Sequence, residues 1–302
     1  MKINFIRYEK ETGNAYYDVV TSIIEPIAAH LKPHTYIISP GYLDDKKYLN
    51  VRFFNEPSKE INSAKTVFIP HGIADKGNRD AKKVRGLKAV FVSGPAWKRK
   101  LTRQGLDPGI IRVNGWPKLD PLFNRPVKRQ TAGKIRILFA PTHTRSKVTI
   151  FHKMDDILKQ FDSSYEVVVS PHPFDWQRIY KNEVIPTYLQ LPKVDAVITE
   201  HSSIFYEAWS LGIPVIFPDW LVRDKLLGYL AGDSFTRKVY ERSLGYHVKS
   251  AEELLEKVQH AVTAGVDDNV REFMEGIFPA KLRGRSGLVT ARHLLKLCKE
   301  EI

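Results

Sequence analysis

The stretch Asp195–Asp219 reads DAVITEHSSIFYEAWSLGIPVIFPD, and it decides the fold. Its apolar run 196–198 predicts a buried strand that ends at a polar cluster. Ser202 or Ser203 can then cap a helix, which ends at the following glycine. The apolar run 213–217 predicts the next buried strand. The segment therefore forms one strand–helix–strand unit of a parallel sheet.

The start of this predicted helix suits a pyrophosphate. The first N–H groups of a helix have no partner within the helix, and its dipole is positive at that end. Two serine hydroxyls, from Ser202 and Ser203, add donors, and Glu200 lies just before them. Glu207, about one turn into the helix, can accept from a ribose hydroxyl. We expect a nucleotide-diphosphate site here; the alternative is that the serines only cap a helix and that Glu207 is solvated.

Length and composition limit the class of protein. A chain of 302 residues with 43% apolar residues is large enough for two domains with separate cores. The single cysteine, Cys298, excludes an intrachain disulfide framework and a cysteine-based metal site. No run of about 18 apolar residues occurs, and the N-terminus lacks the apolar core of a signal peptide. We expect a cytoplasmic protein, with any membrane contact peripheral.

The net charge of +13 favours a polyanionic partner. Nucleic acid, an acidic membrane face and a phosphate-rich substrate all fit this charge. The basic residues form several separate clusters rather than one tail, and each cluster by itself is typical of a solvated face. The charge therefore selects no single partner.

Strands and helices alternate along the chain. We expect strands at 2–8, 35–39, 66–70, 89–93, 110–114, 135–140 and 165–170, and helices at 16–31, 95–104, 151–161 and 286–300. A capping-box match at 250–253 predicts a helix that continues to about 264. The polar, basic segment 125–134 predicts a linker between an acceptor-side domain, 1–124, and a donor-binding domain, 135–302, whose last helix packs back on the first domain. Two doubly wound α/β domains facing a cleft follow from this pattern.

Two short motifs follow predicted strands of the first domain. In the first, His71 precedes Gly72, with Asp75 just beyond; the glycine permits a tight turn, and the histidine can act as a general base near neutral pH. The second is GWPKLD, residues 115–120, whose Trp116, Lys118 and Asp120 suit either an acceptor contact or a hinge. A structural histidine and simple hinge packing are the alternatives.

Two further motifs follow predicted strands of the second domain. APTHTR, residues 140–145, offers the hydroxyl of Thr142 and the guanidinium of Arg145 to a phosphate. SPHPF, residues 170–174, holds His172 between two prolines, where it can donate to an anion at little entropic cost. A polar surface loop and a capped turn are the respective alternatives.

In this order, the five motifs resemble the CDP-glycerol glycerophosphotransferase family, the teichoic-acid primases and polymerases of GT-B architecture. The resemblance runs from about residue 66 to residue 217. It implies that His71 is the base that acts on the acceptor hydroxyl and that His172 contacts the diphosphate. It also implies that Ser202 and Ser203 bind the diphosphate and that Glu207 contacts the ribose.

The chain departs from the family pattern at the donor site. The family usually has an Asp-Tyr pair before the two serines, where this chain has Glu200 and His201. The family's PTWR-like motif reads Pro-Thr-His-Thr-Arg in this chain. These changes bring an extra histidine and a longer acid to the donor site, so the base and the transferred group stay open.

The resemblance implies an in-line displacement at phosphorus. An acceptor oxygen attacks the β-phosphorus of CDP-glycerol or another nucleotide-diphosphate donor, and CMP leaves. We expect no cofactor and no metal, since no Asp-x-Asp motif occurs. The expected acceptor is a polyol phosphate, a lipid-linked molecule or another polyanion.

Three alternatives use the same residues or the same charge. A GT-B glycosyltransferase would place the attack on a sugar carbon, and a sugar-nucleotide epimerase would release neither CMP nor CDP. A basic nucleic-acid-binding protein without catalysis would use Trp97 beside the basic run 98–100, with strongly salt-dependent binding.

Overall fold

The structure is a computed structural model that describes residues 1–7, 16–44, 46–54, 63–75, 81–125, 133–173, 175 and 185–300. The chain divides into two compact units. Unit 1 comprises Met1–Ile73, Arg79–Asn124 and Glu275–Ile302, and unit 2 comprises Ala74–Asn78 and Arg125–Met274. The C-terminal segment therefore belongs to the unit that the N-terminal half builds. Most of the expected linker, 126–132, and Phe174 of the SPHPF motif lie outside the described residues.

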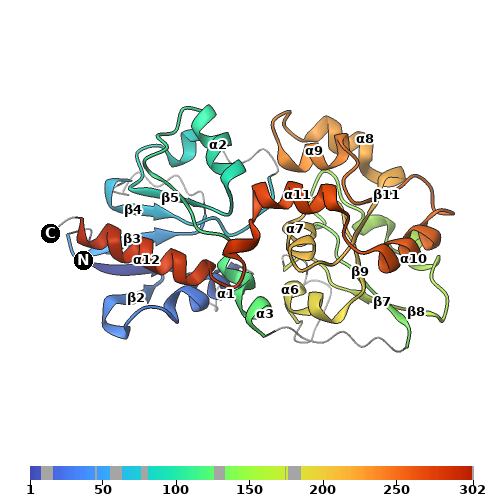
Figure 1. Cartoon of the computed structure of the whole chain (residues 1–302), viewed down its shortest axis with the longest axis horizontal. Coiled ribbons are helices and arrows are strands. Elements are labelled where there is room, and N and C mark those ends of the chain that lie inside the picture. Colours follow the sequence, from blue (N-terminus) through green and yellow to red (C-terminus); the bar gives the residue numbers. More distant parts are fainter. Residues whose placement is uncertain are drawn as a thin grey trace. The chain divides into compact units, whose positions relative to one another are not determined.

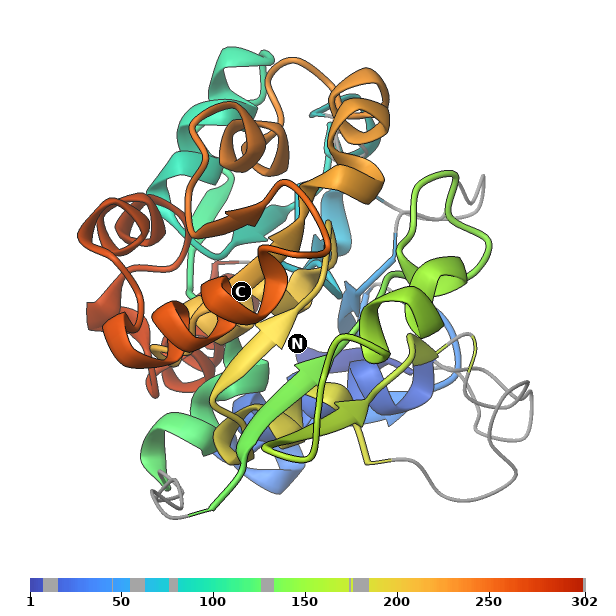
Figure 2. The ribbon, with the colours of Figure 1, turned by 90° about the vertical axis from the view of Figure 1, so that its right-hand side faces the viewer.

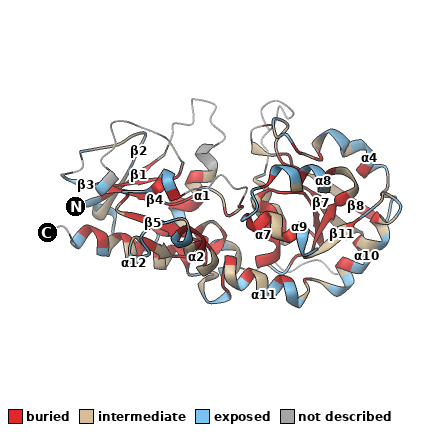
Figure 3. Cartoon of the chain, turned by 90° about the horizontal axis from the view of Figure 1, so that it is seen from above, coloured by how far each residue is buried: buried red, intermediate tan, exposed pale blue. Residues whose placement is uncertain are grey.

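Parallel strands build the sheet of unit 1, in the order β2-β1-β3-β4-β5-β6. The strands are β1 (Lys2–Ile6), β2 (Tyr36–Ser39), β3 (Tyr48–Arg52), β4 (Thr66–Phe68), β5 (Ala89–Val92) and β6 (Ile111–Val113). Most of their residues are buried, as Figure 3 shows. Because β1 pairs with both β2 and β3, the topological switch point lies between β1 and β3.

Helices α1 (Tyr16–Ala28), α2 (Pro95–Arg103), α3 (Asp120–Asn124) and α12 (Ser286–Lys299) complete unit 1. Helix α12 crosses one face of this sheet and packs on α1 (Figure 1). Gly287 in the first turn of α12 permits this packing, since a Cβ atom there would lie 2.2 Å from the carbonyl oxygen of Pro26. The last helix of the chain is thus anchored by backbone-to-backbone contact.

Unit 2 contains a second parallel sheet, in the order β11-β10-β9-β7-β8. Its strands are β7 (Ile135–Phe139), β8 (Tyr165–Val169), β9 (Ala196–Ile198), β10 (Val215–Pro218) and β11 (Tyr246–Val248). The order reverses at β7, which pairs with both β8 and β9. The switch point of unit 2 therefore lies between β7 and β9.

Helices cover both faces of the second sheet. They are α4 (Met154–Leu158), α6 (Thr187–Gln190), α7 (Ser203–Ser210), α8 (Asp219–Tyr229), α9 (Phe235–Glu241) and α10 (Leu254–Ala264), and α11 (Asp268–Ile277) follows. Figure 1 shows α7 and α10 on opposite sides of the strands, and in Figure 2 α10 lies in front of them. The expected doubly wound α/β architecture is confirmed in each unit.

The expected strands and helices occur within a few residues of their predicted bounds, and the predicted capping box differs in detail. The helix predicted from the capping box at 250–253 begins only at Leu254. The carboxylate of Glu253 accepts from the N–H of Lys249 at 3.0 Å, outside the box. Because the side chain closes this earlier turn, residues 251–253 form a turn instead of the first helical residues.

Candidate functional site

The loops after β7 and β9 leave the sheet of unit 2 side by side. Phe139, at the end of β7, lies opposite Ile198, at the end of β9. The hydroxyl of Thr199 ties the two loops, since it donates to the carbonyl of Ala140 at 2.6 Å. This edge, at the switch point, is where open α/β sheets bind ligands. The APTHTR loop and the start of α7 therefore share one location.

A buried carboxylate braces these loops. Glu200 is fully buried, and its Oε1 accepts from the N–H of Thr142 at 2.8 Å and from that of Ile150 at 3.4 Å. The sequence led us to expect a donor contact for Glu200, whereas these contacts make it a support of the APTHTR loop.

His201 packs against the same loop. Its side chain is buried, its Nδ1 lies 3.4 Å from the hydroxyl of Thr142, and its Nε2 lies 3.4 Å from the hydroxyl of Ser146. Its ring meets that of Tyr229 edge-on, with centroids 6.2 Å apart. The extra histidine noted in the sequence thus contacts Thr142 within the APTHTR motif and Ser146 directly after it.

The serine pair begins α7, but not as a side-chain cap. Ser202 has the extended backbone of an N-cap residue, yet its hydroxyl lies 3.2 Å from that of Thr199. Ser203 accepts from the N–H of Ala74 at 3.2 Å. Ser202 is therefore the N-cap residue, as predicted for one of the two serines, but its hydroxyl makes no capping hydrogen bond. The N-terminal end of α7, with its positive dipole end, can therefore interact with another acceptor.

The loop after β8 meets the APTHTR loop. The rings of His143 and His172 lie edge to face, with centroids 5.2 Å apart. Asp175 fixes this contact: its carboxylate accepts from the N–H of Thr144 at 2.9 Å and from its hydroxyl at 2.6 Å. The N–H of Asp175 donates to the carbonyl of His172 at 2.7 Å. Arg145, on the APTHTR loop, is exposed.

Behind these loops, α7 and α9 are tied to the site by buried groups. Glu207 is buried within α7. Tyr240 of α9 is fully buried, and its hydroxyl donates to the carbonyl of Glu200 at 2.9 Å. Burial, reinforced by the charges of Glu200 and Asp219, raises the pKa of Tyr240 well above its ordinary value. The phenol therefore remains a hydrogen-bond donor that supports the loop after β9.

In unit 1, His71 follows β4 and is exposed. Its Nδ1 lies 3.0 Å from the carbonyl oxygen of Phe53, and its ring stacks on that of Phe54 at 4.3 Å. Because a carbonyl oxygen only accepts, this contact places a proton on Nδ1 and makes Nε2 the basic atom of the neutral ring. Gly72, the next residue, is half-buried. His71 thus has the tautomer and the fixed ring orientation that suit a general base.

The GWPKLD motif holds the start of α12. The backbone N–H of Trp116 donates to the hydroxyl of Ser286 at 2.9 Å, and the carboxylate of Asp120 accepts from the N–H groups of Ser286 and Gly287 at 3.1 and 2.6 Å. Burial, the largest effect, raises the pKa of Asp120 to about 6. Trp116 and Asp120 therefore serve the packing of unit 1, while Lys118 beside them is half-buried.

Asp75 is also a structural tie. It is fully buried in unit 2, its carboxylate accepts from the N–H of Phe235 at 2.8 Å, and its carbonyl accepts from the hydroxyl of Ser234 at 2.5 Å. Both partners begin α9. Asp75 therefore stabilises the start of the helix that carries Tyr240.

The structure gathers one group of the predicted residues in unit 2. On or beside the loops after β7, β8 and β9 lie Thr142, Arg145, His172, Glu200, Ser202 and Ser203. Sequence reasoning missed Asp175 and Tyr240 as supports of this group. Asp175 follows the SPHPF motif at once, and that spacing from His172 is the signal that could have found it. Tyr240 belongs to no motif, and only the fold brings it to Glu200.

The structure contradicts the use of Trp97 and the basic run beside it that the nucleic-acid alternative requires. Trp97 is fully buried in α2, so its ring cannot stack on a base. Lys100 is buried too and lies over the Trp97 ring at 5.7 Å from the centroid. This part of the basic run packs into unit 1 instead of forming a nucleic-acid surface.

The described residues contain neither a membrane-spanning helix nor a cluster of metal ligands. None of the helices built by them is long and apolar enough to cross a membrane. Within the same residues, no three side chains of histidine, cysteine, aspartate or glutamate gather where they could hold a metal ion.

Comparison by sequence found no relatives: no protein-family model matches the chain, and no curated protein matches it. Comparison by structure found proteins of similar fold. A variant of the wall teichoic acid polymerase TagF matches with a TM-score of 0.69 at 16% identity, over 99% of this chain and 90% of that chain. Another TagF variant, soaked with CDPG, matches with a TM-score of 0.65 at 17% identity, over 99% of this chain and 89% of that one.

A structure of Anabaena HepE in complex with UDP also matches, with a TM-score of 0.51 at 12% identity and full coverage of both chains. At identities of 12–17%, these matches establish a shared fold. They confirm the GT-B class expected from the sequence, and the fold is similar to that of a teichoic acid polymerase.

Proposed function

We propose that the chain is a nucleotide-dependent transferase that moves glycerophosphate, or a related alditol phosphate, from a CDP-activated donor to an acceptor hydroxyl. The observation that carries the proposal is the meeting of the APTHTR loop with the start of α7 at the switch point of unit 2. That edge combines main-chain donors, hydroxyl groups and a positive helix end, which together suit a diphosphate.

In this proposal, the start of α7 with Ser202 and Ser203 binds the diphosphate, and Arg145 and His172 add charge and donors beside it. Thr142 offers a hydroxyl from the APTHTR loop. Glu207 contacts the ribose from one turn inside α7. Glu200 acts as a positioning residue, because its carboxylate is committed to the N–H of Thr142.

The proposed chemistry is one displacement at phosphorus. Nε2 of His71 accepts the proton of the acceptor hydroxyl, whose oxygen forms a bond to the β-phosphorus of the donor. The bond between that phosphorus and the bridging oxygen breaks, and CMP leaves with the electron pair. Hydrogen bonds from unit 2 stabilise the charge that develops on the phosphate oxygens.

The fold neighbours and the charge of the chain support this donor and acceptor class. TagF is a wall teichoic acid polymerase, and one of its structures was soaked with CDPG. The net charge of +13 suits a polyol phosphate, a lipid-linked phosphate or another polyanion as acceptor. The same charge would favour peripheral contact with an acidic membrane face.

A second candidate is glycosyl transfer from a nucleotide sugar, favoured by the match to HepE in complex with UDP. The donor site would be the same. The acceptor would attack a sugar carbon, so the leaving group would be a nucleoside diphosphate instead of CMP.

Product analysis tests the proposal. The purified chain is incubated with CDP-glycerol and a glycerol phosphate oligomer, and the released nucleotide is identified. We expect CMP, with turnover lost in His71→Ala and retained in the control His34→Ala, an exposed histidine of the same unit. Release of CDP would favour the second candidate. Native turnover by His71→Ala would refute the role of the base.

A further inference from the structure

A short cationic segment borders the proposed donor site of unit 2. Arg145 ends the APTHTR motif, and Ser146 and Lys147 follow it. The N–H of Ser146 donates to the carbonyl of His143 at 2.9 Å and closes one tight turn. The hydroxyl of Ser146 donates to the carbonyl of Val148 at 2.8 Å and closes the next turn. The backbone around Lys147 is therefore fixed, while its side chain is exposed.

His201 places this segment beside the start of α7. Nε2 of its buried ring lies 3.4 Å from the hydroxyl of Ser146. The residue after His201 is Ser202, the N-cap residue of α7. Because Lys147 directly follows Ser146, it lies next to the segment that leads into this helix.

Tyr229, the last residue of α8, borders the same histidine. Its ring meets that of His201 edge-on, with centroids 6.2 Å apart, and 40% of the residue is exposed. Its hydroxyl forms no hydrogen bond with the side chains or backbone that the structure describes. The phenol can therefore donate to a ligand oxygen. Lys147 and Tyr229 thus lie on two elements that both contact the ring of His201.

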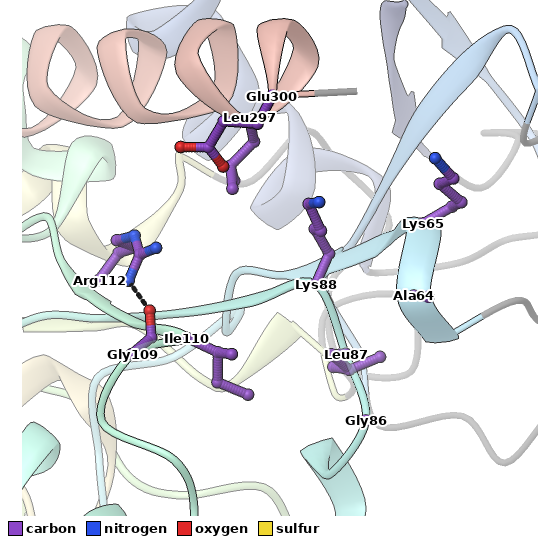
Figure 4. A pocket seen from close by; sticks show the side chains of 10 residues that line it. All are labelled: Ala64, Lys65, Gly86, Leu87, Lys88, Gly109, Ile110, Arg112, Leu297 and Glu300. Atoms are coloured by element: carbon purple, nitrogen blue, oxygen red, sulfur yellow. Dashed lines mark hydrogen bonds between the residues drawn. The ribbon is translucent and has the colours of Figure 1, made fainter. Parts of the chain in front are cut away.

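The charge of Lys147 is not balanced by a partner. Over the described ranges of the chain, neither Lys147 nor Arg145 forms an ion pair or a side-chain hydrogen bond. Figure 4 shows a different case in unit 1, where Arg112 donates to the carbonyl of Gly109 and the carboxylate of Glu300 lines the same hollow. The cations beside the start of α7 are therefore better suited to an anion from solution.

The proposed reaction brings two anions together. The donor carries a diphosphate, and a polyol phosphate acceptor carries phosphate groups of its own. The attacking oxygen has to reach the β-phosphorus, and like charges at such short range repel each other strongly. The start of α7 and Arg145 serve the diphosphate in this proposal. A cation close to them, but separate from them, is needed for the phosphate of the acceptor, and Lys147 has this position.

We propose that Lys147 and the hydroxyl of Tyr229 form a subsite in unit 2 for a phosphate group of the acceptor. The ammonium group pairs with the phosphate, and the phenol donates a hydrogen bond to one of its oxygens. Both side chains bind the acceptor and take no part in proton transfer. This inference rests on the proposed transfer to a phosphate-bearing acceptor, and it names the groups that recognise that acceptor.

Titration of the full chain with glycerol 3-phosphate, in the presence of saturating CDP, tests the subsite without the reaction. CDP fills the donor site, so the titrated phosphate cannot bind there. We expect one molecule to bind per chain, with affinity about fivefold weaker in Lys147→Gln and about threefold weaker in Tyr229→Phe, since each variant loses one contact to the phosphate. The affinity for CDP should stay native in both variants.

Lys193→Gln is the matched control. Lys193 is also exposed and belongs to unit 2, but it lies just before the amino end of β9, at the opposite edge of the sheet from the start of α7. This variant loses the same charge, so it measures the general attraction of a basic chain for an anion. It should bind glycerol 3-phosphate as the native chain does.

The proposal is overturned if glycerol 3-phosphate does not bind, or if Lys147→Gln or Tyr229→Phe binds it with native affinity. It is also overturned if Lys147→Gln weakens CDP binding as much, or if Lys193→Gln weakens glycerol 3-phosphate binding as much. The proposed function fails separately. If the native chain binds no CDP or releases no CMP from CDP-glycerol, the transfer reaction is refuted, and titration with glycerol 3-phosphate alone still decides whether the subsite exists.

Discussion

Replacing Tyr240 by phenylalanine removes a single oxygen atom that connects α9 to the proposed donor site. The hydroxyl of Tyr240 is fully buried and donates to the carbonyl of Glu200 at 2.9 Å. The side chain of Glu200 in turn holds the N–H of Thr142. The substitution therefore loosens the junction of the loops after β7 and β9 without creating a large cavity.

The expected cost follows from the loss of this one bond. A buried acceptor that loses its donor costs about 1–3 kcal/mol, because the carbonyl of Glu200 would remain desolvated. We expect the free energy of unfolding to fall by about 2 kcal/mol in a urea titration. If half of this cost is expressed in the loop that binds the donor, nucleotide affinity should fall about fivefold, since 1.4 kcal/mol corresponds to a factor of ten.

Tyr246→Phe is the matched control. Its hydroxyl donates to the carbonyl of Gly265 at 2.6 Å, so the same group is lost from a bond that does not involve the loops after β7 and β9. It should lower stability by about 1 kcal/mol and leave nucleotide affinity unchanged. The supporting role of Tyr240 is refuted if Tyr240→Phe leaves stability unaltered, or if it lowers stability while nucleotide affinity stays native.

Three further predictions concern single contacts. Gly287→Ala places a Cβ atom 2.2 Å from the carbonyl oxygen of Pro26 and should cost about 3 kcal/mol in urea unfolding, whereas Gly228→Ala, with no atom within 4 Å, should stabilise α8 by up to about 1 kcal/mol. The folded pKa of Asp120, about 6, exceeds the ordinary 3.8, so the folded state binds more protons between these values. The contribution of Asp120 to the free energy of unfolding should therefore fall by about 3 kcal/mol as the pH rises from about 4 to 6 and stay constant above about pH 6. Urea titrations at a series of pH values measure this fall, which Asp120→Asn should remove. Asp175→Asn removes one of the two acceptors for Thr144. It should weaken nucleotide binding about fivefold in calorimetry, and a native affinity would contradict the supporting role of Asp175.

Apolar runs made most of the fold predictable. Several strands of both sheets, such as β4, β5, β9 and β10, are short and buried throughout, so they read as continuous apolar segments bounded by turn residues. Strand β3 escaped prediction because its sequence includes the polar residues Asn50 and Arg52. Asn50 is buried with its amide satisfied by the side chain of Asn4, which donates to it at 2.8 Å, and by the backbone of Leu43. The pairing with Asn4 spans two strands and leaves no local signal.

The grouping of the candidate residues was predictable from the sequence, but their contacts were less so. Motifs at strand ends lie on loops that the structure brings together in unit 2, since parallel strands bring their carboxyl ends to one edge. Whether a side chain faces a ligand or supports a loop depends on distant partners. Glu200 turned toward the N–H of Thr142, and Asp75 toward the start of α9, through contacts that no sequence spacing reveals.

Calorimetric titration with CDP, UDP and GDP tests the central claim, a nucleotide-diphosphate site at the start of α7. We expect one CDP to bind per chain in preference to the other nucleotides. Affinity should fall about tenfold in Ser203→Ala and stay native in Ser164→Ala, an exposed serine of the same unit. Absence of nucleotide binding, or an equal loss of affinity in both variants, would contradict it.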